Sequence, residues 1–196
     1  MAVKIVTVQT FDAAARRIVE HWMRLGKPRI IRLEGFDGVG KSGLAKIIAP
    51  RMGANHVQGD DFAEKQETET PYPNCLRQLD LDQTIGSALA SEHPVILDAV
   101  CLDQIAPSDR WGRGFVVYIK RLSFNNRNPI WQEGLWFEQD EPANEPRRSI
   151  VEYHKQFKPH ESADLIIELP EDGHSIPDFS FDRGLCFDPP GADIAT

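Results

Sequence analysis

A glycine-rich segment that ends in a lysine and a serine carries the clearest chemistry in this sequence of 196 residues. Residues 35–42 read Gly-Phe-Asp-Gly-Val-Gly-Lys-Ser, which matches the pattern G-x-x-x-x-G-K-S. The glycines of such a loop let backbone N–H groups turn inward around phosphate oxygens, while the lysine neutralises the terminal phosphates and the serine ligates Mg²⁺. The residues expected to bind ATP are Gly35, Phe36, Asp37, Gly38, Val39, Gly40, Lys41, Ser42 and Gly43.

Two aspartates stand where they could act on phosphates held by this loop. Asp60 follows a short expected strand, residues 56–59, and Asp98 ends the apolar run that begins at Pro94. The carboxyl ends of parallel strands meet at one edge of a sheet, so both carboxylates are expected beside the loop. Asp60 could then accept a proton from an attacking hydroxyl, and Asp98 could hold Mg²⁺ directly or through water. The alternatives are that Asp60 and Asp61 are solvated acids and that Asp98 caps a turn.

Hydrophobic periodicity indicates the elements that must position these residues. Helices are expected over residues 11–25, 41–52, 79–91 and 145–157, where apolar side chains recur every three or four positions. Strands are expected over residues 29–34, 56–59, 94–97, 115–119 and 165–169. The alternation of strands and helices predicts an α/β fold, with five mainly parallel strands and helices on both faces, in three α/β/α layers.

The length is that of one ordinary domain. We expect this domain to span residues 1–170, with a lid at about residues 120–145, followed by a tail over residues 171–196. The tail is rich in Pro, Gly and Asp, and its phenylalanines could form a hairpin against the body. A loosely ordered end is the alternative.

Composition narrows the classes of partner and compartment. Twenty-two Lys and Arg against 30 Asp and Glu give a net charge of -8, so no broad nucleic-acid or anionic-membrane surface is expected. No apolar run approaches the roughly 18 residues that cross a bilayer, and the three cysteines suit reduced thiols, which together favour a cytoplasmic protein. The oligomeric state is left open. Five histidines show no metal-ligand spacing: His56, His93, His154, His160 and His174.

The arrangement resembles the uridine kinase family of P-loop kinases, whose relatives include phosphoribulokinase and bacterial pantothenate kinase. The resemblance runs, with gaps, from about residue 27 to residue 169. It rests on the phosphate loop, an Asp two residues before a Phe after the second strand, an acid ending the third strand, and the run from Tyr153-His154 through Lys158-Pro159 to residues 163–167.

This resemblance implies a P-loop NTPase fold, the use of ATP and Mg²⁺, and roles for individual residues. Asp60 occupies the place of the family's catalytic carboxylate, and Asp98 that of the acid in its third-strand motif. Tyr72 lies where the family holds its acceptor, which makes it a candidate substrate contact.

The sequence departs from the family in the lid. Family members usually carry an arginine-rich lid that clamps the transferring phosphate, whereas residues 120–129 hold fewer cations. Arg121 and Arg127 are the candidate catalytic lid residues, because arginine offers a forked and permanently charged donor set. Arg147 and Arg148 are a second possibility, and the alternative for each arginine is a surface position.

The leading hypothesis is an ATP- and Mg²⁺-dependent kinase that transfers the γ-phosphate to a hydroxyl of a small molecule, with a nucleoside such as uridine as the first guess. A nucleoside monophosphate kinase is one alternative. Another, from a different class, is a nucleotide-binding switch that phosphorylates no small acceptor.

Overall fold

The computed structural model describes residues 3–64, 70–72, 74–125, 128–131, 145 and 147–170. The strands are β1 (Lys4–Thr7), β2 (Ile30–Glu34), β3 (Asn55–Gln58), β4 (Val95–Asp98), β5 (Phe115–Asn125), β6 (Asn128–Trp131) and β7 (Leu165–Pro170). The helices are α1 (Phe11–Arg24), α2 (Lys41–Met52), the 3-10 helix η1 (Gly59–Phe62), α3 (Gln78–Ala90), α4 (Leu102–Ile105), α5 (Ser108–Trp111), α7 (Arg147–Phe157) and α8 (Pro159–Ser162).

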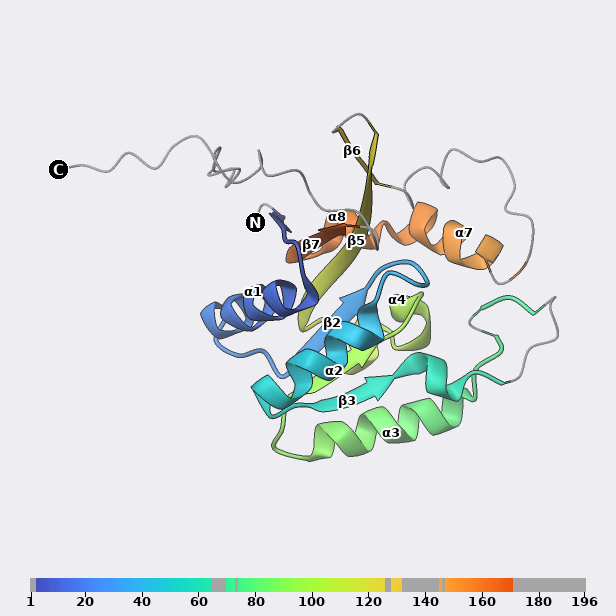
Figure 1. Ribbon diagram of the computed structural model, residues 1–196. Helices are drawn as coiled ribbons and strands as arrows, with labels where there is room; N and C mark the ends of the chain where they lie inside the picture. The colour runs from blue at the N-terminus through green and yellow to red at the C-terminus, as the bar shows by residue number, and fades with distance from the viewer. Residues whose placement is uncertain are drawn as a thin grey trace.

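One twisted sheet forms the centre of the molecule (Figure 1). Its strands follow the order β1-β7-β5-β2-β4-β3, and β6 pairs with β5 outside this path. All neighbouring strands in that order are parallel, whereas β5 and β6 are antiparallel. Every residue of β2 is buried, which is typical of a parallel strand covered on both faces. The strand that leads into the glycine-rich loop therefore lies at the most protected place in the fold.

Helices cover the sheet on both sides. α1 and α2 pack against each other on one face, while α4, α7 and α8 lie on the other (Figure 1). Local signals set the helix ends: the Thr10 hydroxyl accepts from the N–H of Ala13 at the start of α1, and Gly53 closes α2 in a left-handed conformation. The predicted layered α/β fold is confirmed. Among the described residues, no helix has the length and apolar character needed to cross a membrane.

Among the residues that the structure describes, the sheet is larger than predicted, with seven strands in place of five. β1 is an edge strand of four residues that the sequence analysis missed, although its Ile5, Val6 and Thr7 are β-branched residues typical of strands. β6 belongs to the predicted lid: β5 continues to Asn125, and β6 pairs with it in antiparallel orientation. The remainder of the lid, residues 132–144, and the predicted tail, residues 171–196, lie outside the described residues, so the domain boundaries stay predictions.

A buried arginine joins β2 to the helices on the α4 side. Arg32 is 1% exposed and donates to the backbone oxygens of Leu102 and Ala106, at 3.1 and 2.7 Å. Its guanidinium also pairs with Asp103 at 3.0 Å. These contacts satisfy carbonyls around a four-residue helix whose Leu102 and Ile105 are buried in the core, so Arg32 and these apolar side chains together fix the position of α4 against the sheet.

We expect Arg32→Leu to destabilise the fold strongly. The substitution removes the charged donor that the carbonyls of Leu102 and Ala106 and the carboxylate of Asp103 share. The Leu102 carbonyl keeps the N–H of Ala106 and Asp103 keeps the Ser108 hydroxyl, but the loss of a buried charged group should still lower the free energy of unfolding by about 2 to 4 kcal/mol. Urea denaturation measures the change. Arg17→Ala is the control, because Arg17 lies on the exposed face of α1 and its loss should change stability by less than about 0.5 kcal/mol. Equal stability of the two variants would contradict the assigned role of Arg32.

Candidate active site

The glycine-rich loop connects the buried end of β2 to the first turn of α2, as predicted. Two of its glycines are required by close contacts at left-handed backbone angles. At Gly35 (φ +145°) an added Cβ would lie 2.7 Å from the backbone oxygen of Ile119, and at Gly40 (φ +97°) it would lie 2.5 Å from the Phe11 ring. A side chain at either position would therefore displace the loop from the neighbouring strand or from α1.

Lys41 is a buried charge at the centre of the loop. It is 5% exposed, and its Nζ donates to the backbone oxygens of Gly35 at 3.1 Å and Phe36 at 2.6 Å. Burial lowers the pKa of Lys41, while the negative charges of four neighbouring acids raise it in part. These acids, in decreasing order of effect, are Asp60, Asp37, Glu34 and Asp98. The predicted site residues are thus gathered around one ammonium group.

Ser42 and Asp98 are brought into direct contact, as their predicted shared role requires. The Ser42 hydroxyl donates to one carboxylate oxygen of Asp98 at 2.5 Å, and His56 Nε2 contacts the other. Hydroxyl and carboxylate oxygens are hard donors of the kind that Mg²⁺ prefers when it keeps waters and phosphate oxygens as its other ligands. The donor set therefore suits Mg²⁺. No larger cluster of His, Cys, Asp and Glu with metal-binding geometry occurs within the described ranges.

Asp60 lies in η1, directly after the carboxyl end of β3, where its charge acts on Lys41 of the glycine-rich loop. The Tyr72 hydroxyl donates to Asp60 Oδ1 at 3.3 Å, so the two predicted substrate contacts are neighbours. Desolvation is the main cause that raises the pKa of Asp60, and Asp98 and Asp37 add repulsion, while Lys41 and the Tyr72 hydrogen bond lower it. Asp60 is thereby a better proton acceptor than an ordinary aspartate.

One buried group beside the loop, Glu34, was missed by the sequence analysis. Glu34, the last residue of β2, is 2% exposed and accepts a hydrogen bond of 3.0 Å from the Tyr153 hydroxyl of α7. Burial is the main cause that raises the pKa of Glu34 to about 7. The available signal was the alternation of Arg32 and Glu34 in an otherwise apolar strand, since polar residues that are buried need partners.

Three residues of α7 contact different parts of the site. Ser149 accepts from the backbone N–H of Tyr72 at 3.0 Å, and Tyr153 reaches Glu34. His154 stacks on Phe36 of the loop, with ring centroids 4.0 Å apart, and burial lowers its pKa to about 4, so it is neutral near pH 7. One helix therefore touches the Tyr72 segment, the end of β2 and the phosphate loop.

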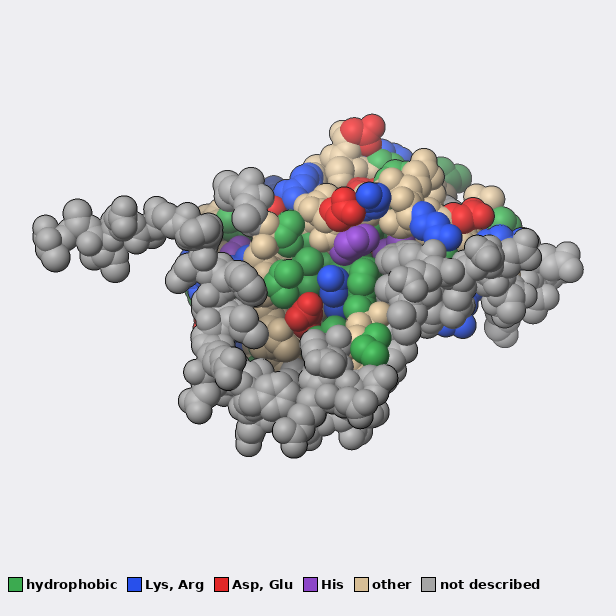
Figure 2. Space-filling view, turned by 90° about the horizontal axis from the view of Figure 1, so that it is seen from above, with side chains coloured by type: hydrophobic (Ala, Val, Ile, Leu, Met, Phe, Trp, Pro, Cys, Tyr) green, Lys and Arg blue, Asp and Glu red, His purple; other side chains and the backbone are tan. Residues whose placement is uncertain are grey.

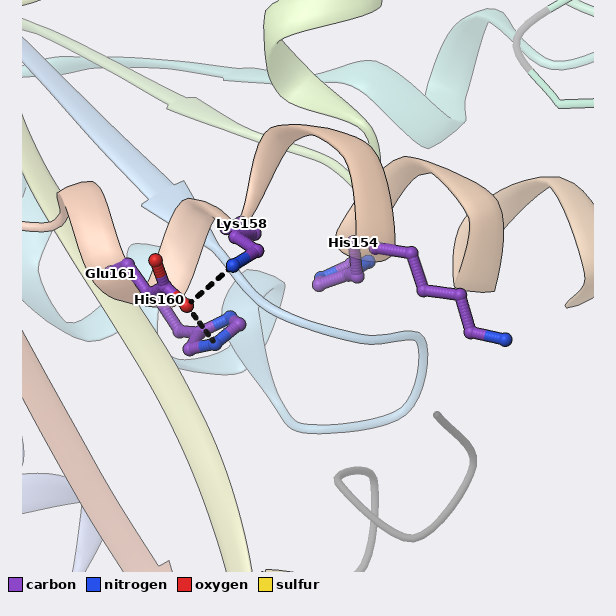
Figure 3. Close-up of a pocket in the computed structure, with 5 residues that line it drawn as sticks. His154, Lys158, His160 and Glu161 are labelled. Atoms are coloured by element: carbon purple, nitrogen blue, oxygen red, sulfur yellow. Dashed lines mark ion pairs between the residues drawn. The ribbon is translucent and has the colours of Figure 1, made fainter. Parts of the chain in front are cut away.

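A cavity of about 270 Å³ lies where α7 meets α8. Figure 3 shows His154, Lys158, His160 and Glu161 around it, with Glu161 paired to Lys158 at 3.2 Å and to His160 at 3.9 Å. Seen from above, acidic, basic and histidine side chains lie close together among hydrophobic ones (Figure 2). His154 lines this cavity and also stacks on Phe36, so it connects the cavity to the phosphate loop.

The structure describes the position of some of the predicted lid arginines but not of all of them. Arg121 donates to the backbone oxygen of Pro170 at 2.6 Å and lies over the Phe11 ring, which itself packs against Gly40. The Phe11 ring therefore lies between Arg121 and the glycine-rich loop. Arg127 lies outside the described residues. Arg147 and Arg148 begin α7, as predicted, and are exposed. Their roles stay predictions.

We expect Gly40→Ala to impair nucleotide binding. The new methyl group would meet the Phe11 ring in a backbone conformation that favours glycine, so the loop amides would be displaced from their inward orientation. Calorimetry should show at least about a tenfold loss of MgADP affinity, which corresponds to about 1.4 kcal/mol. Gly86→Ala, within α3, is the control and should keep normal affinity. Normal binding by Gly40→Ala would show that the loop does not hold the phosphates.

Comparison with known proteins supports the fold. No protein-family model and no curated protein matches the sequence. Among solved structures, a possible uridine kinase from Bacillus stearothermophilus superposes with a TM-score of 0.51 at 13% identity, covering 80% of this chain and 96% of that chain. A gluconokinase from Sinorhizobium meliloti 1021 matches with a TM-score of 0.40 at 18% identity, covering 72% of this chain and 82% of that chain. The superposition on the first structure confirms that this chain has the fold predicted from the resemblance to uridine kinase-like P-loop kinases.

Proposed function

We propose that the protein is an ATP- and Mg²⁺-dependent kinase that transfers the γ-phosphate to a hydroxyl group of a small molecule. The observation that carries the proposal is the convergence of Ser42, Asp98 and Asp60 on the buried Lys41 at the carboxyl ends of three neighbouring strands. A nucleoside is the first acceptor class to test, because the superposed structure is that of a possible uridine kinase.

The chain's own residues divide the work of the reaction. The loop amides and Lys41 hold the phosphates, so Lys41 exchanges its bonds to the backbone oxygens of Gly35 and Phe36 for phosphate oxygens. Ser42 and Asp98 would hold Mg²⁺, which supplies charge neutralisation of the phosphates when bound. Asp60 orients the acceptor hydroxyl and takes its proton as the new O–P bond forms, while the bond between the γ-phosphorus and the β,γ-bridging oxygen breaks and ADP leaves. Tyr72 fixes the Asp60 carboxylate through its hydroxyl.

Lys41→Ala and Asp60→Asn should separate nucleotide binding from transfer. ADP release from MgATP is measured over a panel of nucleosides, pantothenate, sugars and nucleoside monophosphates. We expect one acceptor class to stimulate release. Asp60→Asn should lower kcat by roughly 10²- to 10⁴-fold while sparing MgATP binding, because only the proton acceptor is lost. Lys41→Ala should weaken MgATP binding as well, because the phosphates lose their cation.

The controls of this experiment distinguish the competing functions. Glu152→Gln, on the exposed side of α7, should behave as the parent protein. Stimulation by nucleoside monophosphates alone would indicate a monophosphate kinase. Binding of MgATP with no stimulation by any acceptor would contradict the proposal and favour a nucleotide-dependent switch.

The pH dependence of transfer should report on Asp60. Asp60 must be ionised to take the proton, so the rate should fall as the pH drops through its pKa, which is raised above the ordinary value of about 4. The Tyr72 hydrogen bond lowers this pKa, so Tyr72→Phe should move the acid limb of kcat/KM to higher pH. An acid limb that moves to lower pH, or does not move, would exclude Asp60 as the group that titrates.

A further inference from the structure

Glu34 is a buried acid that the reaction above does not use. Its Oε1 accepts from the Tyr153 hydroxyl at 3.0 Å, whereas its Oε2, also buried, has no hydrogen-bond partner among the described residues. Glu34 directly precedes Gly35, whose carbonyl holds Lys41. Burial disfavours the ionised form of a carboxyl group when one of its oxygens accepts no hydrogen bond. The neutral, protonated form is therefore favoured relative to the same group in water.

The charges that face Glu34 come from every element packed around it. Arg32 of β2 and Lys41 of α2 favour the ionised form, and Asp103 of α4 opposes it. From α7 the Tyr153 hydroxyl favours the ionised form, while the Cys101 thiol, just before α4, also interacts with the Glu34 charge. Asp60 and Asp98 act on the same Lys41 ammonium group as Glu34 does. The balance leaves Glu34 between its two protonation states, with a pKa of about 7.

Phosphate binding changes this balance in one direction. In the structure, Lys41 donates to the two carbonyls that directly follow Glu34. Nucleotide phosphates would draw the ammonium group toward their own oxygens and would place negative charges at the loop. Both changes disfavour an ionised carboxylate at position 34, because repulsion between like charges is large in a buried site.

We propose that Glu34 takes up one proton from solvent when nucleotide phosphates occupy the loop, so that the protein binds nucleotide together with a proton. This inference rests on the proposed function only in requiring that the loop binds nucleotide phosphates. In the bound state Glu34 is a neutral carboxylic acid, and the phosphates no longer face its charge. Nucleotide affinity consequently depends on pH through a residue outside the phosphate contacts.

The proton can be counted by calorimetry. MgADP is titrated into the full chain in PIPES and in Tris, two buffers whose heats of ionisation differ, and the difference in binding heat gives the number of protons taken up. A group with a pKa of about 7 should take up about half a proton per MgADP near pH 7 and close to one near pH 8. MgADP affinity should fall by up to about tenfold per pH unit above pH 7. At such pH the free protein holds Glu34 ionised, so each binding event must take a proton from solvent.

Glu34→Gln is the decisive variant, because it keeps the shape and the acceptor for Tyr153 while removing the titration. It should lose this proton uptake and the associated fall in affinity. Glu152→Gln, the same change on the exposed side of α7, should retain both. Protons contributed by the nucleotide remain in Glu34→Gln. Because the charge of Glu34 also raises the pKa of Lys41, the difference between the two proteins is assigned to Glu34 only together with a variant that leaves both groups in place.

Tyr153→Phe tests the same group without changing it, and covers the case in which Glu34→Gln fails to fold. The Tyr153 hydrogen bond lowers the pKa of Glu34, so its loss should raise that pKa and reduce proton uptake near pH 7, with uptake restored at higher pH. A merely structural role for Tyr153 would weaken binding equally at both pH values.

The outcomes distinguish this inference from the proposed function. Binding heats that are equal in the two buffers, or proton uptake that persists in Glu34→Gln and disappears in Asp60→Asn, would overturn the inference and leave the kinase proposal intact. Absence of MgADP binding in both buffers would overturn the proposed function and the inference with it.

Discussion

The buried charge of Lys41 is the constraint on which the rest of the site depends. An ammonium group at 5% exposure is unfavourable unless carbonyls and negative charges compensate for its lost hydration. The loop supplies two carbonyls, from Gly35 and Phe36. The acids that favour the charged form come from separate places in the chain: the end of β2, the loop itself, η1 and the end of β4. The site therefore forms only when the sheet brings these segments together.

The order of the strands explains how the residues of the site are brought together. β2 lies between β5 and β4, and β4 is followed by β3, so the segments after β2, β3 and β4 meet at one edge. The register aligns Asp98 with Leu33 on one side and with Gln58 on the other, which brings the ends of three strands to the same level. α7 then joins this edge from the other end of the chain, through its contacts with Tyr72, Glu34 and Phe36.

Much of this organisation could be predicted from the sequence, and the remainder has identifiable reasons. The phosphate loop, the strand-end acids and the core elements carry local patterns of spacing and hydrophobicity, and the five predicted strands all occur in the sheet. β1 was missed although three of its four residues are β-branched, because a run of four residues is at the lower limit of the length over which a strand pattern can be read. The contact of His56 with Asp98 depends on the pairing of β3 with β4, and that of Tyr153 with Glu34 spans 119 residues. No local pattern encodes contacts of that kind.

The charge balance of the site shows what the phosphate loop still requires. Lys41 is surrounded by four acids, so the site without ligands contains more carboxylates than the loop lysine can neutralise. A bound triphosphate adds negative charge to this environment, and it can be held only if cations or protons accompany it. Ser42 and Asp98 offer the place for a divalent cation. The charge that spreads over the transferring phosphoryl group needs further donors. The candidate arginines in this chain are Arg121 and Arg127 of the predicted lid, with Arg147 and Arg148 at the start of α7. Because α7 is fixed to the loop by His154 and to β2 by Tyr153, the position of that helix also decides how close its arginines come to the phosphates.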